Sequence, residues 1–259
     1  MVTGFFTGET IMYKGRFAVI IPVYNHEQRV ADVVRGALKL GFPVFVVDDG
    51  STDGTHDAIK EMAGVTIIRH EKNRGKGAAL KSAFEAAAAS ADWAITIDAD
   101  GQHDPENART LIRAIPEDAL AKAVRPIIIG MRENMVGDDV PWTSRFGREF
   151  SNFWVWTSGG PRLRDTQSGF RIYPLPQSAR TKVRANRFQF EVEILAKAGW
   201  NGFPVIEAPV TVSYTPGTPR ISHFRPFVDF WRNSGTFCRM IFQRILIPRF
   251  IRRKMSYRN

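Results

Sequence analysis

The chain has 259 residues, 44% of them apolar, and contains a single cysteine. This composition fits one globular domain and excludes a disordered chain, while the lone cysteine excludes an intrachain disulfide and fits a reducing, cytoplasmic environment. Because no run of about 18 uncharged apolar residues occurs and no signal peptide is visible, we expect neither a transmembrane helix nor secretion.

The formal net charge of +10 is divided unevenly along the chain. Residues 1–120 carry 13 Lys or Arg and 17 Asp or Glu, whereas residues 121–259 carry 23 and 9. A basic half beside a mildly acidic one indicates an anionic partner: a phosphorylated substrate, a membrane surface or a nucleic acid. A basic surface that is merely solvated is the alternative.

The first hundred residues alternate between apolar runs and helical patterns. The runs that predict strands are 17–22, 44–47, 65–68 and 93–97, and helices are expected over 30–38, from about residue 53 or 55, and over 78–91. Strands that alternate with helices over short connections predict an α/β fold with a mainly parallel sheet. We expect residues 1–15 to be a leader and residues 16–223 to form the domain.

The second half of the chain is less regular. Residues 127–132 are expected to form another strand, with Arg132 at its carboxyl end. Residues 145–157 mix aromatic side chains and arginines at roughly helical spacing. Residues 206–212 predict an edge strand, because Pro209 has no backbone N–H to donate to a neighbouring strand and is tolerated where one side of the strand is unpaired.

The C-terminal segment 224–259 is a basic amphipathic tail. From residue 217 to the end there are ten Lys or Arg and one acid, Asp229, interleaved with aromatic and aliphatic side chains. Such helices bind membrane interfaces, and a helix that packs its apolar side on the sheet is the alternative. Both can hold, because Pro248 is expected to kink or end the first tail helix.

Asp98-Ala99-Asp100 follows the apolar run at 93–97. Alternate residues of a strand point the same way, so two carboxylates at the carboxyl end of a buried strand can converge on one divalent cation. Such a cation keeps open positions for substrate phosphates. A solvated acidic turn is the alternative for this motif when it stands alone.

Three other segments lie at the expected strand ends. Tyr24, in the Pro22–Asn25 segment, can stack on a planar base, and Asp48 and Asp49 can accept hydrogen bonds from a base or a ribose. The segment 73–77 (Asn-Arg-Gly-Lys-Gly) suits a close approach to phosphate ahead of a helix N-terminus. Its spacing excludes a Walker or dinucleotide-binding fingerprint.

In this order the segments resemble glycosyltransferase family 2, and more narrowly its dolichyl- and polyprenyl-phosphate sugar synthases. They are Pro-Val-Tyr-Asn, Asp-Asp-Gly-Ser-Thr-Asp-Gly-Thr, Asn-Arg-Gly-Lys-Gly and Asp-Ala-Asp-Gly-Gln-His-Asp-Pro. The resemblance implies the GT-A fold, an inverting mechanism, and a GDP- or UDP-hexose donor carrying mannose or glucose. It also implies Mg²⁺ or Mn²⁺ held by Asp98, Asp100 and Gln102. The donor-binding residues it implies are Pro22, Tyr24, Asn25, Glu27, Asp48, Asp49, Lys76, Asp98, Ala99, Asp100, Arg220 and His223.

The acceptor decides the remaining roles. A hydroxyl acceptor on a lipid or secondary metabolite needs a general base, whereas a polyprenyl phosphate is already ionised and needs positive charge. The candidates for holding a phosphate are Arg132, Arg145, Arg148, Ser151, Ser168 and Arg171. Ser168 and Arg171 lie, with Asp165, in the segment 165–171, which resembles the Asp-x-x-Ser-Gly-Phe-Arg stretch of the family. Asp165 is expected to orient the acceptor or act as base, with a helix cap or an ion pair to Arg164 or Arg171 as the alternatives. The matching segment 188–193 is expected to be structural, with Glu191 or Glu193 paired to an arginine.

Two departures from the synthase pattern concern the donor. His26 stands where many synthases carry Glu, with Glu27 one residue later, and Ser222-His223 stands in place of Ser-Lys. We hypothesise that His223 makes diphosphate binding depend on pH near neutrality, and an affinity that stays flat from about pH 5.5 to 8 would contradict this.

The resulting expectation is a metal-dependent hexosyltransferase that acts on polyprenyl phosphate at the inner, cytoplasmic face of the cell membrane. A nucleic-acid-binding module is the non-enzymatic alternative, but the tail arginines alternate with a wide apolar face, which suits lipid better. A catalytically silent sensor is disfavoured by the intact set of Asp98, Asp100 and Gln102.

Overall fold

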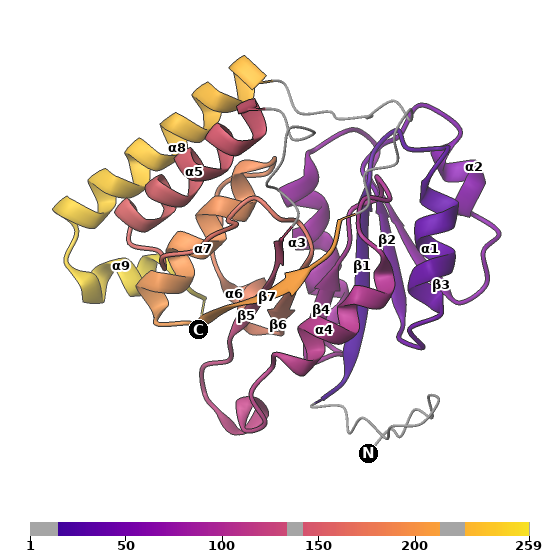
Figure 1. Cartoon of the computed structure of the whole chain (residues 1–259), viewed down its shortest axis with the longest axis horizontal. Helices are drawn as coiled ribbons and strands as arrows, with labels where there is room; N and C mark the ends of the chain where they lie inside the picture. The colour runs from indigo at the N-terminus through magenta and orange to yellow at the C-terminus, as the bar shows by residue number, and fades with distance from the viewer. Residues whose placement is uncertain (1–14, 134–141, 213–225, 259) are drawn as a thin grey trace.

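A computed structural model describes residues 15–133, 142–212 and 226–258 (Figure 1). Within these residues one sheet contains β1 (Phe17–Val23), β2 (Val44–Asp48), β3 (Val65–Arg69), β4 (Trp93–Thr96), β5 (Ile127–Arg132), β6 (Arg171–Pro174) and β7 (Val205–Val210). The strand order is β3-β2-β1-β4-β6-β5-β7, and β6 alone is antiparallel to its neighbours. The sheet is therefore mainly parallel, as the alternation of apolar runs and helical patterns predicts.

Helices cover both faces of this sheet. They are α1 (Val30–Leu38), α2 (Thr55–Ile59), α3 (Lys76–Ala87), α4 (Ala108–Arg113), α5 (Trp142–Thr157), α6 (Gln177–Arg180), α7 (Gln189–Asn201), α8 (Pro226–Leu246) and α9 (Arg249–Ser256), with short 3₁₀ turns at Pro105–Asn107 and Ala119–Ala121. The α/β fold class and the presence of C-terminal helices are confirmed.

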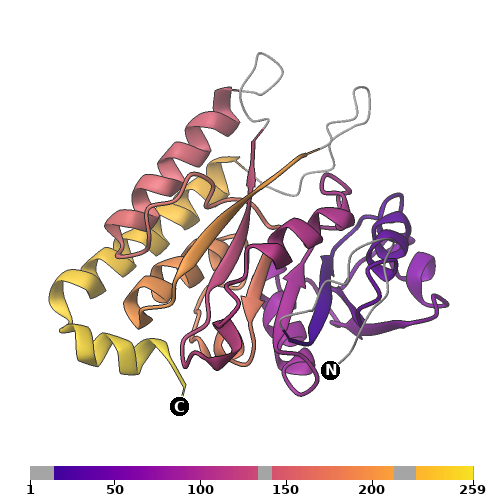
Figure 2. The same cartoon turned by 60° about the horizontal axis from the view of Figure 1, so that its bottom comes forward.

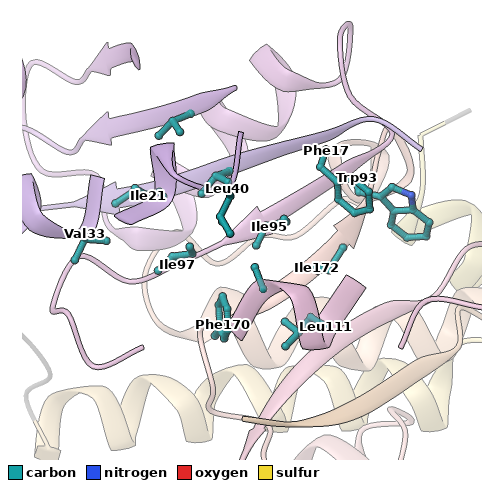
Figure 3. Close-up of a cluster of buried hydrophobic side chains, with 14 of the residues drawn as sticks. Phe17, Ile21, Val33, Leu40, Trp93, Ile95, Ile97, Leu111, Phe170 and Ile172 are labelled. Atoms are coloured by element: carbon teal, nitrogen blue, oxygen red, sulfur yellow. The ribbon is translucent and has the colours of Figure 1, made fainter. Parts of the chain in front are cut away.

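The β1 strand shows how the sheet builds two cores. Phe17, Val19 and Ile21 point into a core shared with α1, α2 and α4, in which Figure 3 labels Phe17 and Ile21. The alternate residues Ala18 and Ile20 point into a core shared with α3 and α7. Because successive strand residues face opposite sides, a strand covered on both faces must be apolar throughout. Every residue of β1 is buried, which explains its continuous apolar run.

A further layer packs on α7 instead of on the sheet. The α5, α8 and α9 helices all contact α7, and α5 and α8 lie side by side (Figures 1 and 2). Every residue of α7 except Gly199 is buried, so this helix forms the interior between the sheet and the outer helices. The tail packs through Phe237 and Met240 of α8, which belong to the same core as α3 and α7.

The predicted elements compare well with the observed ones. The first four predicted strands, the strand with Arg132 at its end and the helix over 145–157 are all present, and β7 is an edge strand that carries Pro209. Pro248 separates α8 from α9 as expected. The prediction omitted the strand β6 and the helices α4, α6 and α7, and the proposed leader lies outside the described residues apart from Gly15. Among the described helices, none has the length and apolarity needed to cross a bilayer.

Candidate active site

The polar motifs gather at one edge of the sheet because of its topology. The strands β1, β2, β4 and β5 run in the same direction, so the residues that follow them meet at their common carboxyl edge. The antiparallel β6 begins at that edge, where Arg171 pairs with Thr96. Between β1 and β4 the strand order reverses direction, which in open α/β sheets opens a crevice for ligands.

Asp98 leaves the end of β4 and forms an ion pair with a lysine from a distant segment. Lys76 Nζ lies 2.6 Å from Asp98 Oδ1 and 2.7 Å from Glu191 Oε1 of α7. Burial alone would lower the pKa of Lys76, but the two carboxylates raise that pKa above its ordinary value. Burial would likewise raise the pKa of Asp98, and Lys76 outweighs it to hold that pKa below its ordinary value. At neutral pH Lys76 is therefore an ammonium and Asp98 a carboxylate.

Gly169 leaves room beside this cluster. A Cβ atom at this position would collide with Asp98 Oδ2 and would lie 2.6 Å from Lys76 Nζ. The backbone of Gly169 is fixed by Thr96, whose hydroxyl donates to its carbonyl oxygen at 2.7 Å. A glycine is thus required where the start of β6 passes the carboxylate of Asp98.

Asp98, Asp100 and Gln102 offer carboxylate and amide oxygens that suit a hard cation. All three side chains are partly exposed, while Ala99 between the two aspartates is buried in the core. The backbone N–H of Gln102 donates to Asp100 Oδ1 at 3.0 Å and shapes the turn. No cluster of three His, Cys, Asp or Glu side chains with a metal-binding arrangement occurs in the described ranges, and the assignment of Gln102 as a third ligand stays a prediction.

His103 lies directly behind this turn. Its ring is buried, with its centroid 5.0 Å from that of Phe170, and its Nδ1 atom has no hydrogen-bond partner. Burial lowers the pKa of His103 to about 4 against the opposing charge of Asp98. The imidazole is therefore neutral at pH 7, and the sequence analysis did not identify this residue.

Asp49 joins the end of β2 to the segment 73–77. Its Oδ2 accepts from the backbone N–H of Gly75 at 2.6 Å, and its Oδ1 accepts from Arg74 N at 3.0 Å and lies 2.6 Å from His70 Nδ1. Asp48 Oδ1 accepts from the backbone of Ser51 at 2.8 Å. Both aspartates are buried, so the structure assigns them the shaping of the loops on either side of the crevice.

The segment after β1 is also joined to the loop after β2. Asn25, which has a positive φ of 52°, exchanges hydrogen bonds with Thr52, and Glu27 Oε2 accepts from the backbone of Gly54 at 2.7 Å. Pro22 lies in β1, and Tyr24 is half-buried at its end. Asn25, Glu27, Asp48 and Asp49, which were expected to bind a nucleoside, thus form hydrogen bonds within and between the segments that follow β1, β2 and β3. Tyr24 follows the end of β1, next to the crevice.

On the acceptor side the structure pairs two of the predicted residues. Arg132 donates through Nε and Nη2 to the two oxygens of Asp165, at 2.7 and 2.8 Å. Burial alone would raise the pKa of Asp165, but Arg132 outweighs burial and holds that pKa below its ordinary value. The half-buried Arg148 of α5 adds its positive charge to the same carboxylate. The expected alternatives, a helix cap or a pair with Arg164 or Arg171, are not what the structure shows.

Three other acceptor candidates are structural. Arg171 is fully buried and donates to the carbonyls of Thr166, Ser168 and Glu191 and to the hydroxyl of Tyr173. Ser151 and Ser168 are also buried, and their hydroxyls accept hydrogen bonds from neighbouring residues. In this structure the three residues serve contacts within the fold, and their assignment to the acceptor phosphate stays a prediction. Arg220, His223 and the side chain of Arg145 lie outside the described residues.

The segment 188–193 contains functional contacts that the sequence analysis partly missed. Glu193 pairs with Arg239, as expected of a glutamate there, but Glu191 pairs with Lys76 and so belongs to the cluster at Asp98. The sequence gives no signal for that contact, since Glu191 and Lys76 are 115 positions apart.

The comparison with known families decides the assignment. The sequence model of glycosyl transferase family 2 matches residues 18–174, more than half of the chain. The chain belongs to glycosyl transferase family 2. Residues 18–174 include Asp98 and the Arg132–Asp165 pair, so the family region contains most of the candidate site, with Glu191 of the Lys76 cluster beyond it.

Members of the family with known activities are similar over most of the chain. A UDP-N-acetylglucosamine–dolichyl-phosphate N-acetylglucosaminyltransferase of Methanococcus voltae is 31% identical over 76% of this chain and 85% of its own length. A polyprenol monophosphomannose synthase of Mycolicibacterium smegmatis is 29% identical over 78% and 79%. These family 2 relatives confirm that the chain is a hexosyltransferase.

Solved structures confirm the fold. Glucosyl-3-phosphoglycerate synthase from Mycobacterium tuberculosis, in complex with Mn²⁺, uridine diphosphate and phosphoglyceric acid, has a TM-score of 0.65 and 18% identity. The match covers 90% of this chain and 80% of that one. Mannosyl-3-phosphoglycerate synthase from Rubrobacter xylanophilus has a TM-score of 0.59 at 16% identity, covering 89% and 74%. This family 2 chain therefore has the expected GT-A fold.

Proposed function

We propose that this enzyme is a metal-dependent, inverting glycosyltransferase that moves a hexose from a GDP- or UDP-sugar to polyprenyl phosphate. The observation that carries the proposal is the arrangement of two opposed groups at the sheet edge. Asp98, Asp100 and Gln102 follow β4, and the Arg132–Asp165 pair with Arg148 lies across β6 from them. The first group suits a diphosphate-bound cation, and the second suits an anionic acceptor.

On the donor side, the oxygens of Asp98, Asp100 and Gln102 would hold Mg²⁺ or Mn²⁺. The cation supplies neutralisation of the charge that grows on the departing nucleoside diphosphate. Tyr24, at the end of β1, stacks on the base, and the loops braced by Asp48 and Asp49 shape its pocket. The complex of the structural neighbour with Mn²⁺ and uridine diphosphate supports a cation in this fold.

On the acceptor side, the bidentate pair with Arg132 gives Asp165 a positioning role. A carboxylate that accepts two charge-assisted hydrogen bonds is a poor proton acceptor, whereas an ionised phosphate needs no base. Arg132 and Arg148 hold the phosphate so that its oxygen attacks the sugar from the face opposite the leaving diphosphate, which inverts the anomeric centre. Transfer to a hydroxyl would instead need Asp165 as base.

The outer helices support a membrane surface as the second partner. Large apolar side chains are exposed on α5, α8 and α9: Phe146, Phe153, Trp156, Trp231, Phe242, Ile245, Leu246, Phe250, Ile251 and Met255. Exposed arginines and a lysine accompany them on α8 and α9, namely Arg244, Arg249, Arg253 and Lys254. Apolar side chains beside basic ones suit the anionic cytoplasmic leaflet, where a lipid-linked acceptor would be found.

The test is a donor screen with GDP- and UDP-hexoses, Mg²⁺ or Mn²⁺, and short polyprenyl phosphates, with products identified by mass spectrometry. We expect a polyprenyl-phosphate sugar of inverted configuration, and we expect EDTA to abolish its formation. Arg132→Ala should reduce transfer at least tenfold, whereas Arg35→Ala, an exposed arginine of α1, should not change it. Transfer only to glycolipids or alcohols, with Arg132→Ala unaffected, would overturn the proposal.

A further inference from the structure

The cluster of Lys76, Asp98 and Glu191 places a cation of the protein itself on the first proposed metal ligand. The ammonium lies 2.6 Å from Asp98 Oδ1, and the three side chains are 16%, 27% and 9% exposed in that order. An ammonium and a divalent cation repel each other strongly when both lie against one carboxylate at such distances. The resident ammonium and an arriving metal ion therefore compete for Asp98.

The structure fixes the start of α3, so Lys76 enters the cluster from a defined backbone. Gly75 has a φ of 100°, and a Cβ there would overlap the carbonyl of Asn186 and the side chain of Arg187. The N–H of Gly75 donates to Asp49 at 2.6 Å, and Ala78 N donates to Asn186 O at 2.9 Å. Lys76 thus follows a backbone held from both β2 and the segment before α7.

Glu191 determines where the ammonium rests. It is the more buried of the two carboxylates, and it belongs to α7, which lies between the sheet and the outer helices. If Asp98 were its only carboxylate partner, the Lys76 ammonium would stay beside Asp98. Shared between two carboxylates, it can shift toward Glu191 when another cation takes Asp98.

We propose that Lys76 is a resident counter-ion of the metal site, which weakens binding of a bare divalent cation and makes tight binding depend on the donor diphosphate. The diphosphate brings negative charge that attracts both the metal ion and Lys76, so it offsets the repulsion between them. Metal and donor then bind as a coupled pair, and Glu191 is the positioning residue that receives the displaced ammonium. This inference rests on the proposed function, because it takes Asp98 as a metal ligand.

The test measures Mn²⁺ binding by the loss of the free-ion electron paramagnetic resonance signal, first with Mn²⁺ alone and then with GDP or UDP added. In the wild type, the effective nucleoside diphosphate should tighten Mn²⁺ binding at least tenfold. Lys76→Gln keeps hydrogen-bonding groups but removes the charge, so it should tighten binding of Mn²⁺ alone at least tenfold and shrink the effect of the diphosphate. Lys76→Arg should restore the wild-type pattern.

Two controls separate this charge effect from a structural one. Lys81→Gln removes a lysine of the same helix that donates to Ala185 and Asn186, and it should leave Mn²⁺ affinity unchanged. Glu191→Gln should weaken binding of Mn²⁺ alone, since the ammonium then has only Asp98 as its carboxylate partner in the cluster. Circular dichroism and thermal unfolding confirm that each variant is folded, and Lys76→Met replaces Lys76→Gln if the latter does not fold.

The outcomes distinguish this inference from the proposed function. Equal or weaker binding of Mn²⁺ to folded Lys76→Gln or Lys76→Met would overturn the role of Lys76 while leaving the metal site in place. If Asp98→Asn binds Mn²⁺ as the wild type does, or if no variant binds Mn²⁺ even with nucleotide, the metal site itself is refuted and the inference falls with it.

Discussion

Gly169 is the residue on which both sides of the site depend most directly. Its backbone is held to β4 by the hydroxyl of Thr96, and the missing side chain is what lets β6 pass the carboxylate of Asp98. The neighbouring Ser168 and Arg171 are buried and continue into the acceptor side. A side chain added at this position would therefore contact the carboxylate of Asp98 first.

We predict that Gly169→Ala will displace Asp98 or Lys76, because the added methyl group has no room between them. Overpacking of this kind costs about 1–3 kcal/mol of unfolding free energy, and Mn²⁺ binding should fall with it. Gly235→Ala in α8 is the matched control, since its Cβ would meet no described atom within 4 Å and should stabilise the helix by about 0.5–1 kcal/mol. Equal stability and metal affinity in Gly169→Ala and the wild type would refute this reading.

His103 gives a prediction about pH. Burial lowers its pKa to about 4 from the ordinary value of 6.5, so in the pH range between these values the unfolded chain binds a proton that the folded protein does not. The stability from neutral His103 is complete above about pH 6.5 and is lost as the pH falls toward 4, by about 3 kcal/mol in total. Urea unfolding at pH 7 and pH 4 should show this loss in the wild type and not in His103→Gln. Parallel curves for the two proteins would exclude the effect.

At the scale of elements, the inner and outer faces of α8 have different roles. Phe237 is 2% exposed and packs against Phe150 and Trp154 of α5, whereas Phe242 is 64% exposed. Phe237→Ala should lower the unfolding free energy by about 3–5 kcal/mol, because it leaves a cavity in the core. Phe242→Ala should change it by less than about 0.5 kcal/mol. Similar thermal shifts in both variants would mean that α8 is not packed as described.

The sequence predicted those elements whose buried residues are apolar, because their burial is visible as an apolar pattern. Strands such as β1 are covered on both faces and read as continuous apolar runs. The β6 strand has four residues and begins with the buried Arg171, whose donors are satisfied by Thr166 O and Ser168 O nearby and by Glu191 O of α7. The α7 helix is buried on nearly every side, so its Glu193 and Lys197 interrupt the pattern that marks a helix. In both cases the buried charges have partners nearby in the sequence and one farther along it: Glu191 O for Arg171 and Arg239 for Glu193.

For the candidate site, the sequence identified the residues better than their contacts. Asp98, Arg132 and Asp165 were predicted on motif and likeness, and the structure brings them to one edge of the sheet. That Arg132 pairs with Asp165, and Lys76 with Glu191, depends on which strands are neighbours, which no local pattern specifies. The burial of Arg171 was not predicted, because a solvent-facing guanidinium and a buried one look the same in a sequence.

At the scale of the whole molecule, the uneven charge leads to a prediction about membranes. The basic tail and its exposed apolar side chains should bind vesicles that contain phosphatidylglycerol more tightly than vesicles of phosphatidylcholine alone. Sedimentation should show binding that weakens as salt rises from about 0.05 to 0.5 M, because salt screens exposed charges. Replacing Phe242 and Ile245 by serine should weaken binding, whereas Leu120→Ser, an exposed leucine outside the tail, should not. Binding that ignores both lipid charge and these substitutions would contradict the prediction.

The far end of the tail is fastened to the body of the protein. Lys182 N donates to Ser256 O and Arg258 N donates to Arg180 O, both at 2.9 Å, and Tyr257 forms a β-bridge with Thr181. A helix pair fixed through Phe237 and again at residues 256–258 cannot swing like a tether. On a lipid surface the body would then keep one tilt and one height and be free only to rotate about the surface normal. Its encounter with the proposed lipid-linked acceptor would then be a search by lateral diffusion in two dimensions, with the direction of approach already set.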